Sequence, residues 1–587
     1  MIFVHPTSWK PLNMLPKKST NYLTEAEKFS NNTEQWAAYE SKGHCVVLAG
    51  PGSGKTKVLI TKIARMLAED VRPPRGIACI TYSNQCVREI KKRLKAIGID
   101  ESERSFVGTI HSFCLQHVLL PYGELAKIDL PTPLKIVSSK EQDRLFADAV
   151  SKINDKNPNS VKTKFEEFRR TILDRNSKEW IDDESNATLV LEYERLLKEK
   201  GVIDFDGIIL SALQMIQNNS WIRKVIKAKF PVLVVDEYQD LGIPLHQIVL
   251  SLCIESGIRL FAVGDPDQSI YGFTGARPSL LNELADASDV EKVQLRMNYR
   301  CCQTIIDGST AALAIERDYR AHNQNEGIIQ GYELKQGLDS QILYVAETLI
   351  PRITDQRKES QLGDIAILYM DKNNGEKIAE ILDRTEYKYV RYDQAAPYKR
   401  TPLTHWLEEC AAWCSEGWRI GEPKLSTIIK RWMSFLISIK KESEIVNARK
   451  ELVRFLFGNR SQSEKLSDWL RKFVSAGLLE RIQTEPAMRD DCETFEKMFG
   501  DSTNEEHRLF QYTVSTLGNQ RGVSDHLNLT TFHSSKGLEY DVVIMLGLEQ
   551  GRIPRLGIAD KAKEEARRLF YVAMTRARHE VHFLWSG

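Results

Sequence analysis

Residues 47–60, VLAGPGSGKTKVLI, combine glycines, a lysine and a threonine at a spacing that suits phosphate binding. Glycines let successive backbone N–H groups converge on an anion, and a helix that begins after them adds its positive dipole end. Lys55 can reach the terminal phosphates, and Thr56 can hold Mg²⁺. Ala49 replaces the first glycine of the strict pattern, and the alternative is an ordinary turn between a strand and a helix. We predict that the chain binds a nucleoside triphosphate.

Two adjacent acids, Asp236 and Glu237, follow the apolar run FPVLVV. Acids at the end of a buried strand are costly unless a cation or a substrate uses them. Asp236 would complete the Mg²⁺ shell opposite Thr56, and Glu237 would position and deprotonate the attacking water. An acidic pair alone is a weak signal, but it becomes a strong one together with the glycine loop upstream.

The segment VGDPDQSIYGFTGARP contains a polar residue, Gln268, followed by two aromatic residues in a glycine-containing loop. Gln268 stands at a predicted strand end, where it can sense a γ-phosphate. Tyr271 and Phe273 lie among glycines, and aromatic rings beside flexible backbone suit the stacking of unpaired bases. The alternative is a loop that packs onto the core through these two rings.

Two arginines would complete the chemistry. Arg300 occurs in LRMNYR and Arg576 in FYVAMTRAR. A guanidinium can stabilise the charge that develops on a transferring phosphoryl group. A single arginine is more often a surface ion-pair partner, so this prediction depends on the surrounding motifs.

The elements that must position these residues alternate between short apolar runs and amphipathic helices. HCVVLAG, GIACITYS, FPVLVVDE and IRLFAVGD predict one set of buried strands, and VEKVQLRMNY, GDIAILYM, NLTTFHS, YDVVIMLG and EVHFLW predict a second set. Buried strands separated by helices favour parallel sheets covered on both faces. The predicted fold class is α/β, with two parallel-sheet lobes that each carry a mainly helical insertion.

The predicted domain boundaries follow from this alternation. They are a first lobe at 1–114, its helical insertion at 115–225, the rest of the first lobe at 226–285, the second lobe at 286–397, a short helical accessory insertion at 398–525 and the end of the second lobe at 526–587.

Composition limits the class of protein. A chain of 587 residues is long enough for several domains, and 42% hydrophobic with 27% charged residues is typical of a soluble globular protein. There is no long apolar run and no signal peptide, so we expect a cytoplasmic protein without membrane contact. The net charge of +1 neither supports nor excludes nucleic acid. The close pairs Cys301/Cys302 and Cys410/Cys414 lack companions at zinc spacing, and we interpret them as buried thiols.

In order and spacing, the motifs resemble those of superfamily 1 helicases of the UvrD/Rep/PcrA type. The matching segments are NTEQ, AGPGSGKT, ITYSNQCVREI, GTIHSF, DFDGIIL, VVDEYQD, GDPDQSIYGFTGA, LRMNYR, TTFHSSKGLEYDVVIMLG and FYVAMTRAR. The resemblance covers most of the chain outside the two insertions. It implies two RecA-like lobes with ATP and Mg²⁺ between them, 3′→5′ movement on single-stranded DNA, and duplex junctions as substrates.

The resemblance also implies roles for individual residues. Gln35 would read the adenine and Tyr299 would stack on it. Gln268, Arg300 and Arg576 would contact the γ-phosphate, with both arginines reaching over from the second lobe. The implied nucleotide-binding residues are Gln35, Gly50, Gly52, Ser53, Gly54, Lys55, Thr56, Tyr299, Gly537 and Glu539. The implied DNA-binding residues are Tyr82, Asn84, Thr109, His111, Tyr271, Phe273, His533 and Ser535, with Phe205 as a weaker candidate.

The chain departs from the family pattern in several places. Phe273 stands where the family usually has tryptophan, the 398–525 insertion is short, and RYDQAAPY lacks the expected glycine-rich words. The sequence ends soon after TRAR, so we expect neither the usual partner-binding tail nor a nuclease domain. These features resemble the compact UvrD-like helicases that accompany a separate nuclease in bacterial anti-phage systems, such as the helicase subunit of Gabija.

Three other functions stay open at this level. The first is a chromosomal repair or replication-restart helicase. The second is a DNA-responsive ATPase that signals to a partner without processive unwinding, which the short accessory insertion motivates. The third is an RNA-directed helicase, which the DNA-type wording of the motifs disfavours.

Overall fold

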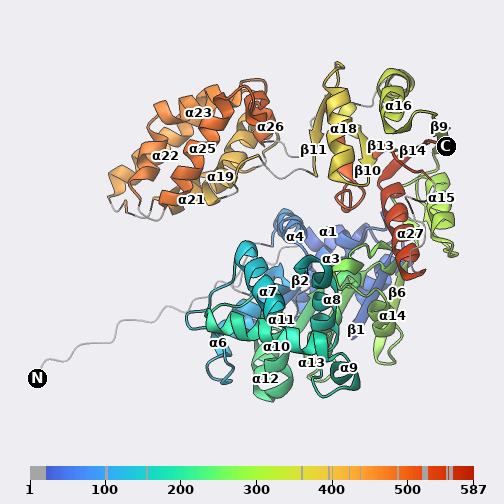
Figure 1. Cartoon of the computed structure of the whole chain (residues 1–587), viewed down its shortest axis with the longest axis vertical. Coiled ribbons are helices and arrows are strands. Elements are labelled where there is room, and N and C mark those ends of the chain that lie inside the picture. The colour runs from blue at the N-terminus through green and yellow to red at the C-terminus, as the bar shows by residue number, and fades with distance from the viewer. Residues whose placement is uncertain are drawn as a thin grey trace, which may run out of the picture. The chain divides into compact units, whose positions relative to one another are not determined.

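The computed structural model of the chain describes residues 21–99, 104–153, 157–357, 361–393, 397–399, 401–421, 423–436, 438–439, 441–485, 488–518, 526–549, 551, 553 and 560–587. The chain divides into two compact units, each built on one six-stranded sheet (Figure 1). The first unit comprises Met1–Asn325 and Ile558–Thr575, and the second comprises Glu326–Gly557 and Arg576–Gly587. Among the described residues, no helix is long and apolar enough to cross a bilayer.

The sheet of the first unit is entirely parallel, with the strand order β3-β2-β4-β5-β1-β6. Its strands are β1 (His44–Ala49), β2 (Ile77–Thr81), β3 (Ser105–Thr109), β4 (Val232–Val235), β5 (Arg259–Gly264) and β6 (Val290–Leu295). Successive residues of a strand point to opposite faces, so Val46 joins one apolar core and Val47 the other. The four strands predicted for the first set are confirmed.

The position of strand β6 differs from the prediction, which placed it in the second set of strands. The sequence VEKVQLRMNY was assigned to the second set of strands, yet Val290–Leu295 pairs along β1 from His44↔Val290 to Ala49↔Leu295. The predicted boundary after residue 285 therefore cuts off a strand of the first sheet, and the first compact unit continues to Asn325. A strand's alternation of apolar and polar residues records burial on a face, but it does not record which sheet the strand joins.

The sheet of the second unit is also parallel, with the order β11-β12-β10-β13-β14-β9. Its strands are β9 (Ile328–Glu333), β10 (Ile365–Tyr369), β11 (Lys388–Arg391), β12 (His526–Thr531), β13 (Tyr540–Met545) and β14 (Ala577–Trp585). The remaining strands of the predicted second set are thus confirmed. The edge strands β9 and β11 were not predicted, because their side chains are largely exposed or half-buried and give little apolar signal.

Helices surround both sheets. In the first unit these include α1 (Asn21–Glu27), α2 (Thr33–Glu40), α3 (Lys55–Arg65), α4 (Asn84–Ala96), α5 (Ile110–Cys114), α13 (Ile243–Cys253), α14 (Ser279–Ala285), α15 (Gln303–Leu313) and α27 (Asp560–Met574). In the second unit they include α16 (Gly337–Tyr344), α17 (Ile350–Gln356) and α18 (Lys372–Leu382).

Both predicted insertions are helical. The first contains α6 (Leu120–Tyr122), α7 (Ser139–Ile153), α8 (Pro158–Thr171), α9 (Lys178–Asp182), α10 (Glu184–Glu199), α11 (Phe205–Asn218) and α12 (Ser220–Lys229). The second contains α19 (Pro402–Ala412), α20 (Trp418–Ile420), α21 (Leu425–Phe435), α22 (Glu442–Gly458), α23 (Leu466–Ser475), α24 (Leu478–Gln483), α25 (Arg489–Thr503) and α26 (Val514–Gly518). Each insertion has its own apolar core, and the second is centred on the stacked rings of Trp406 and Trp432.

Candidate nucleotide and nucleic-acid sites

The glycine-rich loop between β1 and α3 has the tight backbone that phosphate binding requires. Gly52 and Gly54 adopt positive φ angles of 66° and 85°, which side chains other than glycine rarely tolerate. The hydroxyl of Ser53 donates to the Gly50 carbonyl at 2.7 Å and closes the turn. A Cβ at Gly50 would come within 2.8 Å of the Tyr319 ring. The sequence did not reveal Tyr319 as a neighbour of the loop.

Lys55 begins α3, and its ammonium is buried without a hydrogen-bond partner among the described residues. Burial raises the pKa of the Asp236 and Asp265 carboxyl groups, and the Lys55 charge opposes both shifts, which places all three groups in one electrostatic neighbourhood. A buried cation without a partner is unfavourable until an anion arrives. The loop therefore fits the phosphates of a nucleotide.

Asp236 directly follows β4 and is buried. Burial, with the adjacent charge of Glu237, raises the pKa of Asp236 to about 7, although the Lys55 ammonium opposes this shift. Thr56, the second residue of α3, is half-buried. A hydroxyl and a carboxylate are oxygen ligands of the kind that Mg²⁺ prefers, so these residues fit the predicted ion.

Glu237 adopts a left-handed backbone with φ 52°, which is strained for a residue with a side chain. Its carboxylate accepts a hydrogen bond from the side-chain amide of Gln239. The Gln239 oxygen in turn accepts from the backbone N–H of Asp265 at 3.0 Å, and the Gln268 amide donates to the Asp265 carboxylate at 2.6 Å. A chain of hydrogen bonds therefore joins Glu237 to Gln268. The sequence indicated both ends but not the link, Gln239.

The residues predicted to bind adenine lie beside the same loop. Gln35 is buried and donates to the Ser53 carbonyl at 2.9 Å. The Tyr299 backbone N–H donates to the Gly52 carbonyl at 2.8 Å, and the residue is 43% exposed. Asn32 joins the two, because it caps the helix that carries Gln35 and donates to the Tyr299 hydroxyl at 3.0 Å. Asn32 was not predicted.

The two arginines belong to different compact units. Arg300 lies in the first unit. It packs against the glycine-rich loop, since a Cβ atom added at Gly52 would lie 2.7 Å from the Cβ of Arg300. The expectation that Arg300 comes from the second lobe is therefore not met. Arg576 lies in the second unit, is buried, and donates to the Leu538 carbonyl at 3.4 Å.

The SSKGLEY segment surrounds Arg576 in the second unit. The Tyr540 backbone N–H donates to the Arg576 carbonyl at 2.9 Å. Gly537 has φ 84°, and the Glu539 carboxylate accepts from Arg578 at 3.3 Å. Gly537, Glu539 and Arg576 are thus brought together at the starts of β13 and β14.

Two pairs of rings gather among the predicted DNA-binding residues. Tyr82 and Tyr271 stack with their centroids 5.6 Å apart and their planes at 20°. His111 packs edge-on against Phe205 at 5.6 Å, and Phe205 is 55% exposed. Burial lowers the pKa of His111, which favours the neutral form of its imidazole. Thr109 caps α5 by accepting from the Ser112 backbone N–H at 3.2 Å, which is a structural task.

The remaining predicted DNA contacts have different outcomes. Asn84 begins α4 and Phe273 lies in a short 3₁₀ turn, and both side chains lie outside those that the structure describes. His533 follows β12 and is half-buried. Ser535 is fully buried, and its hydroxyl donates to the Phe532 carbonyl at 2.7 Å. Its hydroxyl is therefore committed to the protein's own backbone, which does not support the predicted contact.

The loop that carries Tyr271 is also held by α27. Glu565 accepts from the Gly272 backbone N–H at 2.9 Å, and Arg568 donates to the Ser269 carbonyl at 3.0 Å. These two helix residues were not predicted. A sequence gives no direct signal for a side chain that bonds to a distant backbone.

Comparison with known proteins agrees with this geometry. Residues 31–289 match the UvrD/REP helicase N-terminal domain, and residues 434–586 match the UvrD-like helicase C-terminal domain. The chain is 25% identical over 618 residues to the ATP-dependent DNA helicase PcrA of Staphylococcus aureus (strain MRSA252), covering 94% of this chain and 82% of that protein. For PcrA of Staphylococcus epidermidis (strain ATCC 12228 / FDA PCI 1200) the identity is 24% over 621 residues, with the same coverage. The chain belongs to the UvrD/Rep/PcrA-type family of ATP-dependent DNA helicases.

Proposed function

We propose that the chain uses ATP hydrolysis to move 3′→5′ along single-stranded DNA and to open duplex junctions. The observation that carries this proposal is the Lys55 ammonium, which is buried in a glycine-rich loop near the Asp236 carboxyl and has no hydrogen-bond partner among the described residues. The phosphates of ATP would supply the hydrogen-bond acceptors that this ammonium lacks.

In ATP hydrolysis, the residues of the glycine-rich loop, those that follow β4 and the two arginines would have different roles. Thr56 and Asp236 would hold Mg²⁺, which when bound screens phosphate charge and fixes the triphosphate. Glu237 would accept a proton from the attacking water, and Gln239 would keep its carboxylate in place. Arg300 and Arg576 would stabilise charge on the transferring phosphoryl group.

The aromatic rings near the Tyr271 loop support a single-stranded substrate. Stacking on aromatic rings tolerates any base, because every base has a π-face. The Tyr82–Tyr271 pair and the exposed Phe205 would offer such faces, with Phe273 as a further predicted ring. Alternate gripping of the strand by the two units, gated by nucleotide binding, would convert hydrolysis into steps.

Strand displacement tests this proposal. ATP turnover is measured without nucleic acid, with oligodeoxythymidylate and with the matching RNA, and unwinding is measured on duplexes with a 3′ or a 5′ tail. We expect stimulation by DNA and unwinding of the 3′-tailed duplex alone. DNA-stimulated turnover without unwinding would instead favour the signalling ATPase, and preferential stimulation by RNA would favour the RNA helicase.

For the biological role, we propose anti-phage defence together with a separate nuclease subunit, with chromosomal repair as the alternative. The support is the short 398–525 insertion and the resemblance to the helicase subunit of Gabija noted above. Affinity capture from the native host decides between these roles. Defence would be supported if a nuclease co-purifies and if the host loses protection against phage when Lys55 is replaced. Co-purifying repair proteins, together with sensitivity of the host to DNA damage, would support the alternative.

A further inference from the structure

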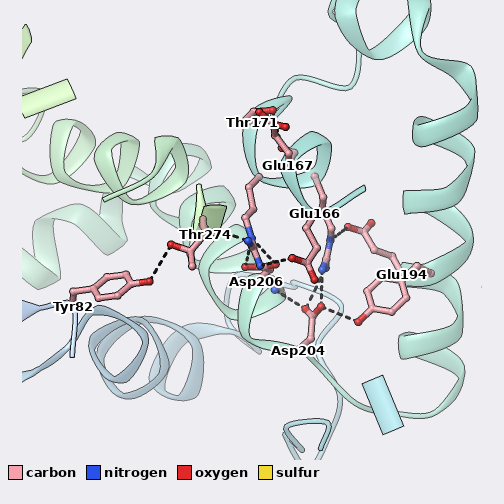
Figure 2. A network of polar contacts seen from close by, with 12 residues as sticks. Tyr82, Glu166, Glu167, Thr171, Glu194, Asp204, Asp206 and Thr274 are labelled. Carbon is pink, nitrogen blue, oxygen red and sulfur yellow. Dashed lines mark hydrogen bonds and ion pairs between the residues drawn. The ribbon is translucent and has the colours of Figure 1, made fainter. Parts of the chain in front are cut away.

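A guanidinium lies between the two pairs of rings. Arg170, near the end of α8, donates through Nε to both carboxylate oxygens of Asp206, at 3.0 and 2.9 Å. Its Nη1 donates to the Thr274 carbonyl at 3.3 Å. Figure 2 shows Asp206 and Thr274 within this network. Both ion-pair partners are half-buried, with 24% of each side chain exposed.

Besides its ion pair with Glu166 at 3.6 Å, Arg170 bonds Thr274 and Asp206, which each lie next to a different ring pair. The Thr274 hydroxyl lies 3.2 Å from the Tyr82 hydroxyl (Figure 2). Tyr82 in turn stacks on Tyr271. Asp206 follows Phe205 in the chain, and Phe205 packs against His111. Arg170 of the helical insertion therefore connects the loop that carries Tyr271 and Thr274 to the start of α11.

The neighbouring residue has a different task. Arg169 is buried and holds Asp204 through two hydrogen bonds, of 2.6 and 3.2 Å. Asp204 also accepts from Tyr193 at 3.0 Å and caps α11 at Gly207. This buried cluster holds α8, α10 and α11 together. It therefore provides a fixed base from which Arg170 extends toward Thr274.

We propose that Arg170 is a positioning residue for single-stranded DNA, because it fixes the Tyr82–Tyr271 pair relative to the His111–Phe205 pair. The inference rests on the proposed function. Glu565 and Arg568 of α27 hold the 269–272 end of the loop, whereas Arg170 holds the other end at Thr274, beside the left-handed Gly275 (φ 93°). The guanidinium suits this task, because hydrogen bonds from a charged donor to a carboxylate or a carbonyl are stronger than those from a neutral donor.

A direct contact between Arg170 and a DNA phosphate is the competing explanation, and the partner residue separates the two. If Arg170 positions the rings through Asp206, then Asp206→Asn should weaken binding much as Arg170→Ala does. If Arg170 binds phosphate, Asp206→Asn should leave binding equal or tighter, because it removes one of the two carboxylates, Asp206 and Glu166, that pair with the guanidinium. Loss of a phosphate contact also reduces the salt dependence of binding, whereas loss of a positioning contact does not.

The experiment measures binding of a fluorescent oligodeoxythymidylate to the full chain at several salt concentrations. The variants are Arg170→Ala, Arg170→Lys, Asp206→Asn and the double variant. Arg175→Ala is the matched control, because Arg175 lies in the same insertion and pairs with Glu194 at 2.7 Å, and among the described residues its hydrogen bonds and ion pairs do not involve the loop. Thermal unfolding of each variant corrects the affinity for the folded fraction.

We expect Arg170→Ala and Asp206→Asn each to weaken binding about tenfold, with an unchanged salt slope. The double variant should be no weaker than either single variant, because both remove one interaction. Arg170→Lys should not rescue binding, since an ammonium lacks the fork that bonds both partners. The DNA concentration that half-saturates ATP turnover should rise by the same factor.

Other outcomes overturn the inference. Normal or tighter binding by Asp206→Asn, with a reduced salt slope in Arg170→Ala, would make Arg170 a phosphate contact. Equal behaviour of Arg170→Ala and Arg175→Ala would leave it an ordinary scaffold residue. If the wild-type chain fails to bind the oligonucleotide at all, the proposed function fails first and the inference falls with it.

Discussion

The side-chain amide of Gln239 donates a hydrogen bond to the carboxylate of Glu237, and its oxygen accepts one from the Asp265 backbone N–H at 3.0 Å. Gln239 is fully buried. Its position therefore fixes the predicted base relative to the segment that carries Gln268.

Gln239→Leu should lower kcat by about tenfold or more with little change in KM for ATP, because it keeps the side-chain volume but removes the hydrogen bond from Gln239 to the Glu237 carboxylate. Gln341→Leu is a matched control. Gln341 is equally buried, donates to Glu549 at 2.9 Å and accepts from the Gly547 backbone N–H at 2.9 Å. Steady-state kinetics and thermal unfolding of both variants check the prediction, and equal losses of turnover would contradict it.

Lys55→Ala should abolish ATP hydrolysis with little loss of folding stability, because the removed ammonium has no hydrogen-bond partner among the described residues. Lys62 on the same helix provides the contrast. It is buried and donates to the backbone carbonyls of Tyr39 and Ser41, so Lys62→Ala should destabilise the fold. Turnover and chemical denaturation of both variants test this. Near-normal turnover of folded Lys55→Ala would refute the assignment of the phosphate loop.

The raised pKa of Asp236 predicts how the stability of the nucleotide-free protein varies with pH. Because its folded pKa of about 7 lies above the model-compound value of 3.8, the folded state binds the proton more tightly. The stability that this proton supplies is complete below about pH 4 and is lost as the pH rises through 7. Asp236→Asn should remove this loss and raise the free energy of unfolding at pH 8 by on the order of a few kcal/mol.

Denaturant unfolding of the wild type and Asp236→Asn at pH 5 and pH 8, without nucleotide or divalent cations, measures that effect. The gap between the two proteins should widen as the pH rises. A constant gap would mean that the Asp236 carboxyl does not titrate in this range.

Arg576→Ala should lower kcat far more than ATP affinity, because a charge that acts on the transition state lowers kcat and kcat/KM together. Arg576 is buried, so thermal unfolding must accompany the kinetics. Arg576→Lys keeps the charge without the planar fork and should retain part of the activity. A raised KM with unchanged kcat would assign Arg576 to ground-state binding instead.

Phe273→Ala should weaken binding of single-stranded DNA by about 1–3 kcal/mol if the ring stacks on a base. Phe273→Trp should retain or improve binding, since it enlarges the stacking face. A core position predicts the opposite pattern, in which Ala leaves a cavity and Trp overpacks. Thermal stability and DNA affinity of both variants decide, and a destabilised Ala variant with unchanged affinity per folded molecule would exclude stacking.

The sequence by itself determined the features that depend on neighbouring residues. The glycines before Lys55 predict the left-handed turn at Gly52 and Gly54, because only glycine adopts it without strain. The apolar runs predict the central strands of both sheets, since a strand buried on both faces must be apolar throughout. Asp236 and Glu237 were identifiable because they directly follow such a run.

Only the tertiary structure decided the features that join distant segments. Strand β6 pairs with β1 rather than with the second sheet, and Arg300 lies in the first unit. Gln239 links two segments by hydrogen bonds, and the Ser535 hydroxyl is turned inward. These outcomes depend on which backbone groups and side chains meet after folding. Residue type and local spacing do not predict such contacts, because a hydrogen bond between distant segments depends on the backbone path of both segments.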